Sequence, residues 1–114
     1  MDLTRPLTST ALYILLALAE RDLHGYAVMQ TVREVSGGRV PLRTGSFYRY
    51  LSQLIDAGLV AEAAGRRASA DPRRGADYRL TARGRQVLES ERRHLAGLVA
   101  AMDAVRPSTR KGLA

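Results

Sequence analysis

The sequence of 114 residues contains no cysteine and no tryptophan, and only 5% of its residues are aromatic. Without cysteine the chain forms neither disulfides nor thiolate sites, which fits a reducing compartment. It has no run of about 18 apolar residues, so a hydrophobic membrane-spanning helix is excluded. No basic segment precedes an apolar block at the amino terminus, and we therefore expect no signal peptide and a cytoplasmic protein.

Catalytic and metal-binding patterns are also missing. The two histidines, His24 and His94, lie far apart in the sequence and in no cluster of metal ligands. Gly37 and Gly38 are not followed by the Lys and Ser or Thr of a phosphate-binding loop. The acidic residues offer no pair for acid–base chemistry. We expect no enzyme activity, metal or cofactor; His24 is interpreted as a capping or packing residue and His94 as exposed.

Negative charge is in the minority, because 11 Asp and Glu stand against 18 Lys and Arg, giving a formal net charge of +7. Such an excess attracts polyanions, since binding releases counterions from their phosphates. The same excess can simply keep a protein soluble, so it indicates a nucleic-acid partner without establishing one. A chain of this length is expected to form one domain with its own core.

The most informative segment runs from Leu42 to Val60. Four apolar residues recur there at helical spacing and predict a buried edge: Phe47, Leu51, Leu54 and Ile55. Gly58 stands where a helix usually ends. The other side of this helix carries polar groups that suit a DNA groove: Thr44, Ser46, Tyr48, Arg49, Tyr50 and Gln53. We expect Arg49 and Gln53 to contact base edges, because each can make two hydrogen bonds there.

The hydroxyl-bearing residues of this helix are expected to have a different role. Thr44, Ser46 and Tyr48 suit phosphates, where a donor fixes the register without reading sequence. Two alternatives stay open. Tyr48 could be an aromatic that packs beside the β-wing predicted below. Tyr50 could either face DNA or pack on the first helix.

Two further helices are predicted before this segment. The first runs from Ser9 to Glu20, with a stripe that is expected to face the core rather than a partner: Leu12, Leu15, Leu16 and Ala19. The second runs from Gly25 to Val35 and ends at Gly37 and Gly38, with these apolar residues turned to the core: Val28, Met29, Val32 and Val35. The order of helices predicts a helix-turn-helix core whose third helix reads DNA.

A short β-structure is predicted next. Residues 59–64 and 78–80 can form strands, and residues 65–77 between them are rich in Gly, Ala and Arg. A strand pair this short must pack on the helices to be stable. It would form a wing whose arginines contact the DNA backbone or an adjacent minor groove: Arg66, Arg67, Arg73 and Arg74. The alternative is a surface loop that touches nothing.

The last helix is predicted from Thr81, a good N-cap, to about Val105, because Pro107 prevents its continuation. Its apolar residues approximate a coiled-coil seam and are expected to form a dimer interface: Leu88, Leu95, Leu98, Val99, Met102 and Val105. Charged residues are placed off this seam: Glu89, Glu91, Arg92 and Arg93. A long helix beyond a small domain cannot bury such a seam alone. Folding back along its own domain is the alternative.

The predicted fold class is therefore mainly α with a small β-wing: a winged helix-turn-helix followed by a long C-terminal dimerisation helix. Residues 1–80 are expected to form the DNA-binding domain and residues 81–106 the dimerisation helix. Residues 107–114 are expected to be a basic, disordered tail. We see no internal repeat and no second domain.

Several motifs, taken in order, resemble the PadR family of bacterial transcriptional regulators. They are Leu23-His24-Gly25-Tyr26, Ser36-Gly37-Gly38, Gly45-Ser46-Phe47-Tyr48, Leu54 to Val60, and Tyr78-Arg79-Leu80-Thr81-Ala82-Arg83-Gly84. One such fragment would be weak evidence, whereas the ordered set at the expected spacing is strong. The resemblance covers about residues 7–102. With one helix after the wing, the chain is similar to the compact subfamily.

The resemblance implies a winged-helix homodimer that usually represses transcription from a palindromic operator. It also implies that a phenolic or multidrug-like effector can release the DNA in some members. Drug-binding members of the compact subfamily stack flat ligands between tryptophans in the dimer interface; this chain has no tryptophan, so the resemblance does not imply such a site here. The expected partners are double-stranded DNA, a second copy of the chain and, if one exists, a small hydrophobic or aromatic effector in a dimer cleft lined by Leu15, Leu98 and Met102.

The chain departs from the family's pattern within the DNA-reading helix. Arg49 and Tyr50 stand where many members have Pro or Ala after the helix Tyr, and Ser52 and Gln53 stand where basic residues often follow. The operator sequence therefore does not follow from the resemblance, and we expect Arg49 and Tyr50 to carry this protein's own preference. An alternative function is a winged-helix module whose positive surface binds an acidic protein.

Overall fold

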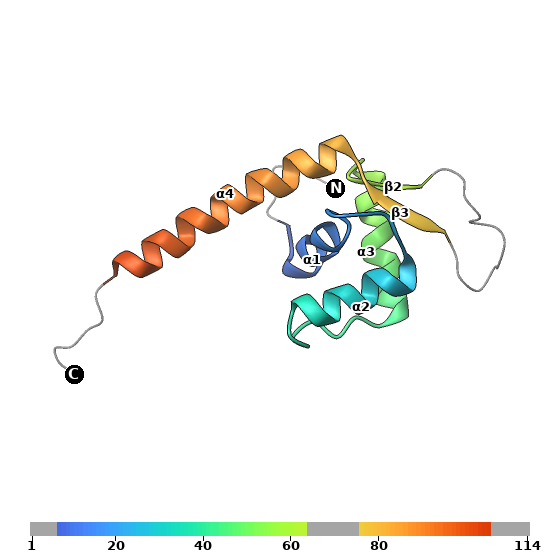
Figure 1. The fold of residues 1–114 in the computed structure, drawn as a ribbon, viewed down its shortest axis with the longest axis horizontal. Coiled ribbons are helices and arrows are strands. Elements are labelled where there is room, and N and C mark those ends of the chain that lie inside the picture. Colours follow the sequence, from blue (N-terminus) through green and yellow to red (C-terminus); the bar gives the residue numbers. More distant parts are fainter. Residues whose placement is uncertain (1–6, 64–75, 106–114) are drawn as a thin grey trace.

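The computed structural model describes residues 7–63 and 76–105. Four helices and a small sheet make up this part of the chain (Figure 1): α1 Ser9–Ala17, β1 Leu23–His24, α2 Gly25–Val35, α3 Thr44–Asp56, β2 Val60–Glu62, β3 Asp77–Leu80 and α4 Ala82–Ala104. The predicted fold class, mainly helical with a small wing and a long C-terminal helix, is confirmed. The four wing arginines and the predicted disordered tail lie outside the described residues.

The sheet is antiparallel, with strand order β1-β3-β2. Tyr78 of β3 stands opposite Leu23 of β1 on one side and Glu62 of β2 on the other. The sequence predicted β2 and β3 but indicated no strand between the first two helices. A strand of two residues has no period to detect, and its partner lies far along the chain, so β1 could not be recognised from local pattern.

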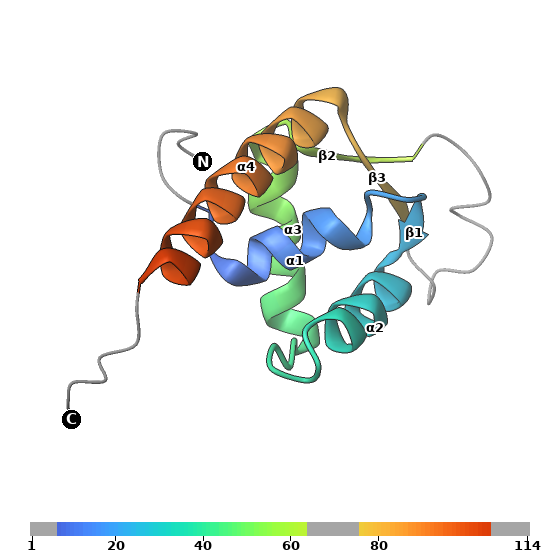
Figure 2. The ribbon, with the colours of Figure 1, turned by 60° about the vertical axis from the view of Figure 1, so that its left-hand side comes forward.

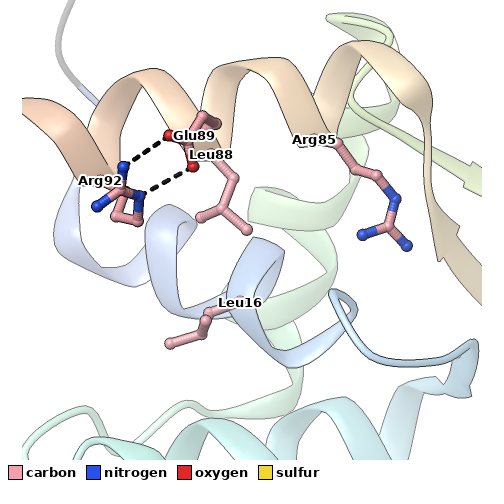
Figure 3. Close-up of a pocket in the computed structure, with 5 residues that line it drawn as sticks. All are labelled: Leu16, Arg85, Leu88, Glu89 and Arg92. Carbon is pink, nitrogen blue, oxygen red and sulfur yellow. Dashed lines mark hydrogen bonds and ion pairs between the residues drawn. The ribbon is translucent and has the colours of Figure 1, made fainter.

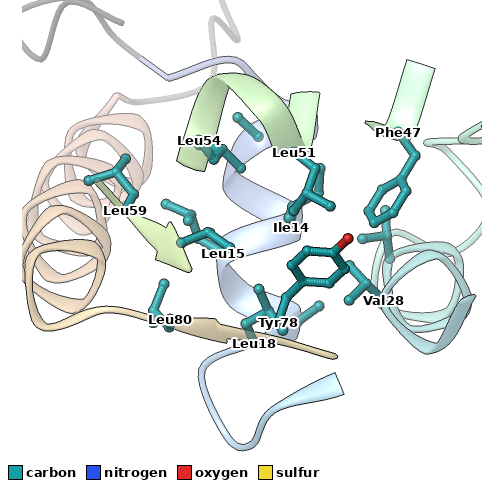
Figure 4. Close-up of a cluster of buried hydrophobic side chains, with 14 residues drawn as sticks. Ile14, Leu15, Leu18, Val28, Phe47, Leu51, Leu54, Leu59, Tyr78 and Leu80 are labelled. Carbon is teal, nitrogen blue, oxygen red and sulfur yellow. The ribbon is translucent and has the colours of Figure 1, made fainter. Parts of the chain in front are cut away.

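One hydrophobic core joins the three helices before the wing to the sheet. Its fully buried members include Ile14, Val28, Phe47 and Leu54, and Tyr78 enters it from β3 (Figure 4). Helix α1 lies between α4 and α2, with α3 crossing behind it (Figure 2), and it contacts all three. The core therefore fixes α3 against α1 and α2 and leaves its opposite side free.

The predicted stripe on the first helix is wrong in part. Leu15 is fully buried, whereas Leu16 is 43% exposed and Leu12 is only partly buried. Ala11, Ile14, Ala17 and Leu18 are the residues that join it in the core. Nearly every position of α1 is apolar and three helices surround it, so hydrophobic periodicity could not tell which positions face inward. In α2, Val28 and Val32 are buried as predicted, but Val35 is exposed.

Glycine ends α3 and thereby fixes the start of the wing. Gly58 has a φ of 80°, the left-handed conformation that glycine adopts without steric cost. The Leu59 amide donates to the Leu54 carbonyl at 3.0 Å, and the Gly58 amide donates to Ile55 at 2.9 Å. These two bonds form a Schellman motif, and the buried side chains of Leu54 and Leu59 accompany it.

Helix α4 starts at the same junction. The Thr81 hydroxyl donates to the Gly58 carbonyl at 2.7 Å and accepts from the Gly84 amide at 2.9 Å, as its predicted N-cap role requires. Gly84 is the one buried residue of α4, and a side chain there would collide with the Leu59 carbonyl oxygen and with Leu80. The end of α3 and the start of α4 are therefore held at fixed positions relative to each other.

Candidate nucleic-acid interface

Helix α3 is anchored by one edge and exposed along the other. Phe47, Leu51 and Leu54 are buried, as the sequence predicted, while Arg49 and Gln53 are exposed. At about 100° per residue, Ser46, Arg49 and Gln53 lie within one arc on the side away from the core. This arc presents a hydroxyl, a guanidinium and an amide, which can donate to and accept from base edges and phosphates.

The two tyrosines do not share that arc, because each lies about 100° from Arg49, on opposite sides. Tyr50 is partly buried against the core, and the Arg49 guanidinium lies 6.0 Å from the centre of its ring. Tyr48 is 42% exposed, and its ring meets the ring of Phe47 edge to face at 4.8 Å. Burial, together with the nearby Tyr48 and Glu62, raises the pKa of the Tyr78 phenol above its ordinary value.

The amino-terminal end of α3 supplies further groups for an anion. Its N-cap, Arg43, makes no side-chain bond to the first turn, so the backbone amides there have no cap within the described chain. Arg43 and Thr44 are both exposed at this end. Free amides and arginines together can hold a phosphate. Arg43 is not among the predicted site residues, although its position just before a predicted helix was a signal for it.

The wing contributes one described arginine. Tyr78 and Leu80 point into the core from β3, so Arg79 between them points outward and is exposed. The predicted contacts of Arg66, Arg67, Arg73 and Arg74 fall within residues 64–75, which join β2 to β3 outside the described part of the chain.

The predicted dimer seam is exposed on α4. Leu88 packs partly against the core, but the outer residues are open to solvent: Leu95 38%, Leu98 48%, Val99 52%, Met102 58% and Val105 70% exposed. The outer part of α4 extends away from the other helices (Figure 1). The outer half of α4 therefore does not fold back along its own domain, whereas its first turns, up to Leu88, pack against the core.

One charged residue lies on the seam, contrary to the sequence interpretation. In the continuous helix, Leu88, Glu91 and Leu95 are separated by three and then four residues, the spacing of a heptad seam. Glu91 is partly buried, whereas Glu89, Arg92 and Arg93 are exposed. The spacing of apolar residues alone does not indicate that an acidic residue occupies a seam position.

A pocket of about 290 Å³ lies where α4 crosses α1, lined by Leu16, Arg85, Leu88, Glu89 and Arg92 (Figure 3). Arg85 donates to the Ala19 carbonyl at 3.1 Å, and Arg92 donates to the Glu89 carboxylate at 2.7 and 2.9 Å. The bonds from Arg92 lower the pKa of Glu89. The predicted cleft lining by Leu15 is wrong, because that side chain is fully buried; its neighbour Leu16 lines the pocket instead.

The two histidines lie in different elements, His24 in β1 and His94 in α4. His24 precedes α2 without donating or accepting a side-chain cap bond, and its ring stacks on Tyr26 with centroids 6.5 Å apart. His24 thus occupies the predicted N-cap position of α2, and its side chain packs rather than capping the helix by a hydrogen bond. His94 is exposed as expected. Residues 7–63 and 76–105 hold no group of three or more His, Cys, Asp or Glu that could bind a metal. Nor do they include a helix long and apolar enough to cross a membrane.

A helix-turn-helix core with an exposed third helix and an adjoining β-hairpin defines a winged-helix DNA-binding protein. Residues 14–90 match the "Transcriptional regulator PadR-like family". The chain belongs to this family, as its motifs predicted, and is a DNA-binding regulator of transcription. No curated protein matches the sequence.

Solved structures with the same fold include other regulators of this kind. A PadR family transcription regulator from Clostridium difficile is 23% identical, with a TM-score of 0.68 over 84% of this chain and 96% of that one. A PadR-like transcription factor from Bacteroides fragilis is 19% identical, with a TM-score of 0.69 over 84% and 88%. RosR of H. salinarum is 24% identical, with a TM-score of 0.62 over 89% and 96%. These likenesses support the fold.

Proposed function

We propose that the protein is a homodimeric repressor that binds a palindromic operator, with α3 of each copy in the major groove. The observation that carries this proposal is the two-sided character of α3. Phe47, Leu51 and Leu54 hold it in the core, while Arg49 and Gln53 stand on the free side. An anchored helix with an exposed arc of base-reading groups is what a DNA reader requires. Such a protein would act in the cytoplasm, with the DNA.

Within this interface the side chains divide by chemistry. Arg49 and Gln53 contact base edges, and Ser46 lies on the same arc at the end where Thr44 begins the helix. The first-turn amides and Arg43 hold phosphates at the start of α3, and the arginines of the segment between β2 and β3 make further phosphate contacts: Arg66, Arg67, Arg73 and Arg74.

Helix α4 is the element through which a second copy of the chain would bind. Its outer half exposes a row of large apolar side chains that one chain leaves uncovered: Leu95, Leu98, Val99, Met102 and Val105. Packing this row against another copy, together with Leu88 at its inner end, would remove it from water and place two α3 helices on one duplex. We place the boundary between the DNA-binding and dimerisation parts at residues 80 and 81, just before α4.

An effector would act at the pocket between α1 and α4. Leu16 and Leu88 offer apolar surface and Arg85 and Arg92 offer positive charge beside the proposed seam. A small hydrophobic or aromatic molecule bound there would change how the two copies pack, and so the distance between the two α3 helices.

Arg49→Ala tests the base-reading role. The operator is first selected from random DNA with the wild-type protein, and binding is then measured to that site and to random DNA. We expect the variant to lose about 1–3 kcal/mol on the selected site and to prefer a different sequence. Arg93→Ala is the matched control, because it removes the same charge from an exposed position on α4. It should keep the wild-type preference. An equal loss on selected and random DNA would refute the role of Arg49.

A further inference from the structure

The first residue of α2 lies unusually close to a side chain of α3. Gly25 is buried, and a Cβ atom there would be 2.7 Å from Tyr48 Oη and 3.3 Å from Phe47 Cε2. The described glycines with positive φ are Gly37, Gly38 and Gly58, so backbone conformation does not explain glycine at position 25. What does explain it is the close approach of the Tyr48 phenol, which any larger residue would displace.

Tyr48 is held on more than one side. Its ring packs edge to face on Phe47 at 4.8 Å, and its hydroxyl reaches the backbone of α2 at Gly25. It also lies close enough to Tyr78 of β3 to influence that phenol electrostatically. The side chain of Tyr48 therefore lies close to both α2 and β3. Around the axis of α3 it is about 100° from Arg49.

We propose that Tyr48 is a positioning residue, which fixes the orientation of α3 by packing against the backbone of α2 at Gly25. This inference rests on the proposed function of α3 as the DNA reader. The phosphate contact predicted for Tyr48 from sequence would use its hydroxyl on DNA. The positioning role instead uses the ring and its contact with Gly25, and it presents Ser46, Arg49 and Gln53 at a fixed angle.

The two roles differ in what each substitution does. Tyr48→Phe removes a hydroxyl that a phosphate contact needs but keeps the ring that positioning needs. Gly25→Ala places a methyl group against the end of a half-exposed side chain, so the phenol moves while the backbone keeps its fold. Combining them removes the atom at 2.7 Å and leaves Cζ of residue 48 at 3.4 Å and Phe47 Cε2 at 3.3 Å from the new methyl group, so only a small shift of the Phe47 ring is still needed. Tyr48→Phe should therefore rescue Gly25→Ala.

The test uses the full chain and a DNA site selected with the wild-type protein. Gly25→Ala should weaken binding to this site by about tenfold, whereas Tyr48→Phe and the double variant should stay within about threefold of wild type. NMR of the tyrosine rings without DNA should show the Tyr48 signals displaced in Gly25→Ala and restored in the double variant. Gly97→Ala is the control, because a Cβ atom there meets nothing within 4 Å.

A double variant that binds no better than Gly25→Ala, or a Tyr48→Phe variant as weak as Gly25→Ala, would overturn the positioning role. If Gly25→Ala does not fold, Tyr48→Ala keeps Gly25 and removes the ring; it should lose about tenfold in affinity, and wild-type affinity would overturn the inference. Failure of the wild-type protein to select any DNA site is a different result, which would reject the proposed function itself.

Discussion

Individual glycines explain why α3 and α4 meet where they do. Gly58 supplies the left-handed turn after α3, and Gly84 lets the first turn of α4 approach the Leu59 carbonyl. Thr81 connects them by bonding to both. The sequence predicted a helix stop at Gly58 and a cap at Thr81. No local pattern indicates why position 84 must be glycine, because the requirement comes from the close approach of segments that are distant in the sequence.

Gly84→Ala should destabilise the protein by about 1–3 kcal/mol, since the new methyl group collides with a backbone carbonyl that cannot move cheaply. Equilibrium urea unfolding measures the effect. Gly97→Ala, on the same helix but in open space, should instead stabilise by up to about 1 kcal/mol through helix propensity. Equal effects of the two substitutions would contradict the close packing at Gly84.

At the scale of elements, helices with clear caps and one apolar face were predictable. The core edge of α3 and the start of α4 at Thr81 follow from spacing and capping residues that act locally. The buried face of α1 was harder to predict, because its apolar residues lie all round the helix and their burial depends on three neighbouring helices. β1 depends on pairing with β3, which a local reading cannot supply.

The same distinction applies to the candidate site. Arg49 and Gln53 could be placed on the free side of α3 because helical geometry alone determines it. The contact of Tyr48 with Gly25 joins two helices, so only the structure reveals it. Its charge alone predicts a solvent-facing position for Glu91, whereas its spacing from Leu88 and Leu95 puts it on the predicted seam.

The exposed half of α4 makes a direct prediction about assembly. Leu98→Glu puts a charge into the proposed seam, where burial without a partner is costly, and should convert the dimer to monomer. Sedimentation equilibrium measures the mass. Ala100→Glu adds the same side chain to an exposed position on the opposite side of the helix and should leave the dimer intact. Dimers of unchanged affinity in Leu98→Glu would exclude this seam as the interface.

At the scale of the whole molecule, the fold places two kinds of surface at opposite ends. One end presents α3 with the wing strands beside it, and the other is the projecting half of α4 with its uncovered apolar row (Figure 1). Neither surface alone is sufficient for the proposed selective binding of an operator. One α3 helix contacts only a few base pairs, so selectivity for an operator requires a second copy at a fixed distance.

The central claim is that α4 pairs two copies so that both α3 helices read one duplex. Selection of binding sites from random DNA, followed by footprinting of the wild-type protein, tests it most directly. We expect two inverted half-sites with centres about one helical turn, roughly 34–36 Å, or a multiple of it apart, protected by one dimer. A single asymmetric site protected by one chain, or no selected sequence at all, would contradict the account.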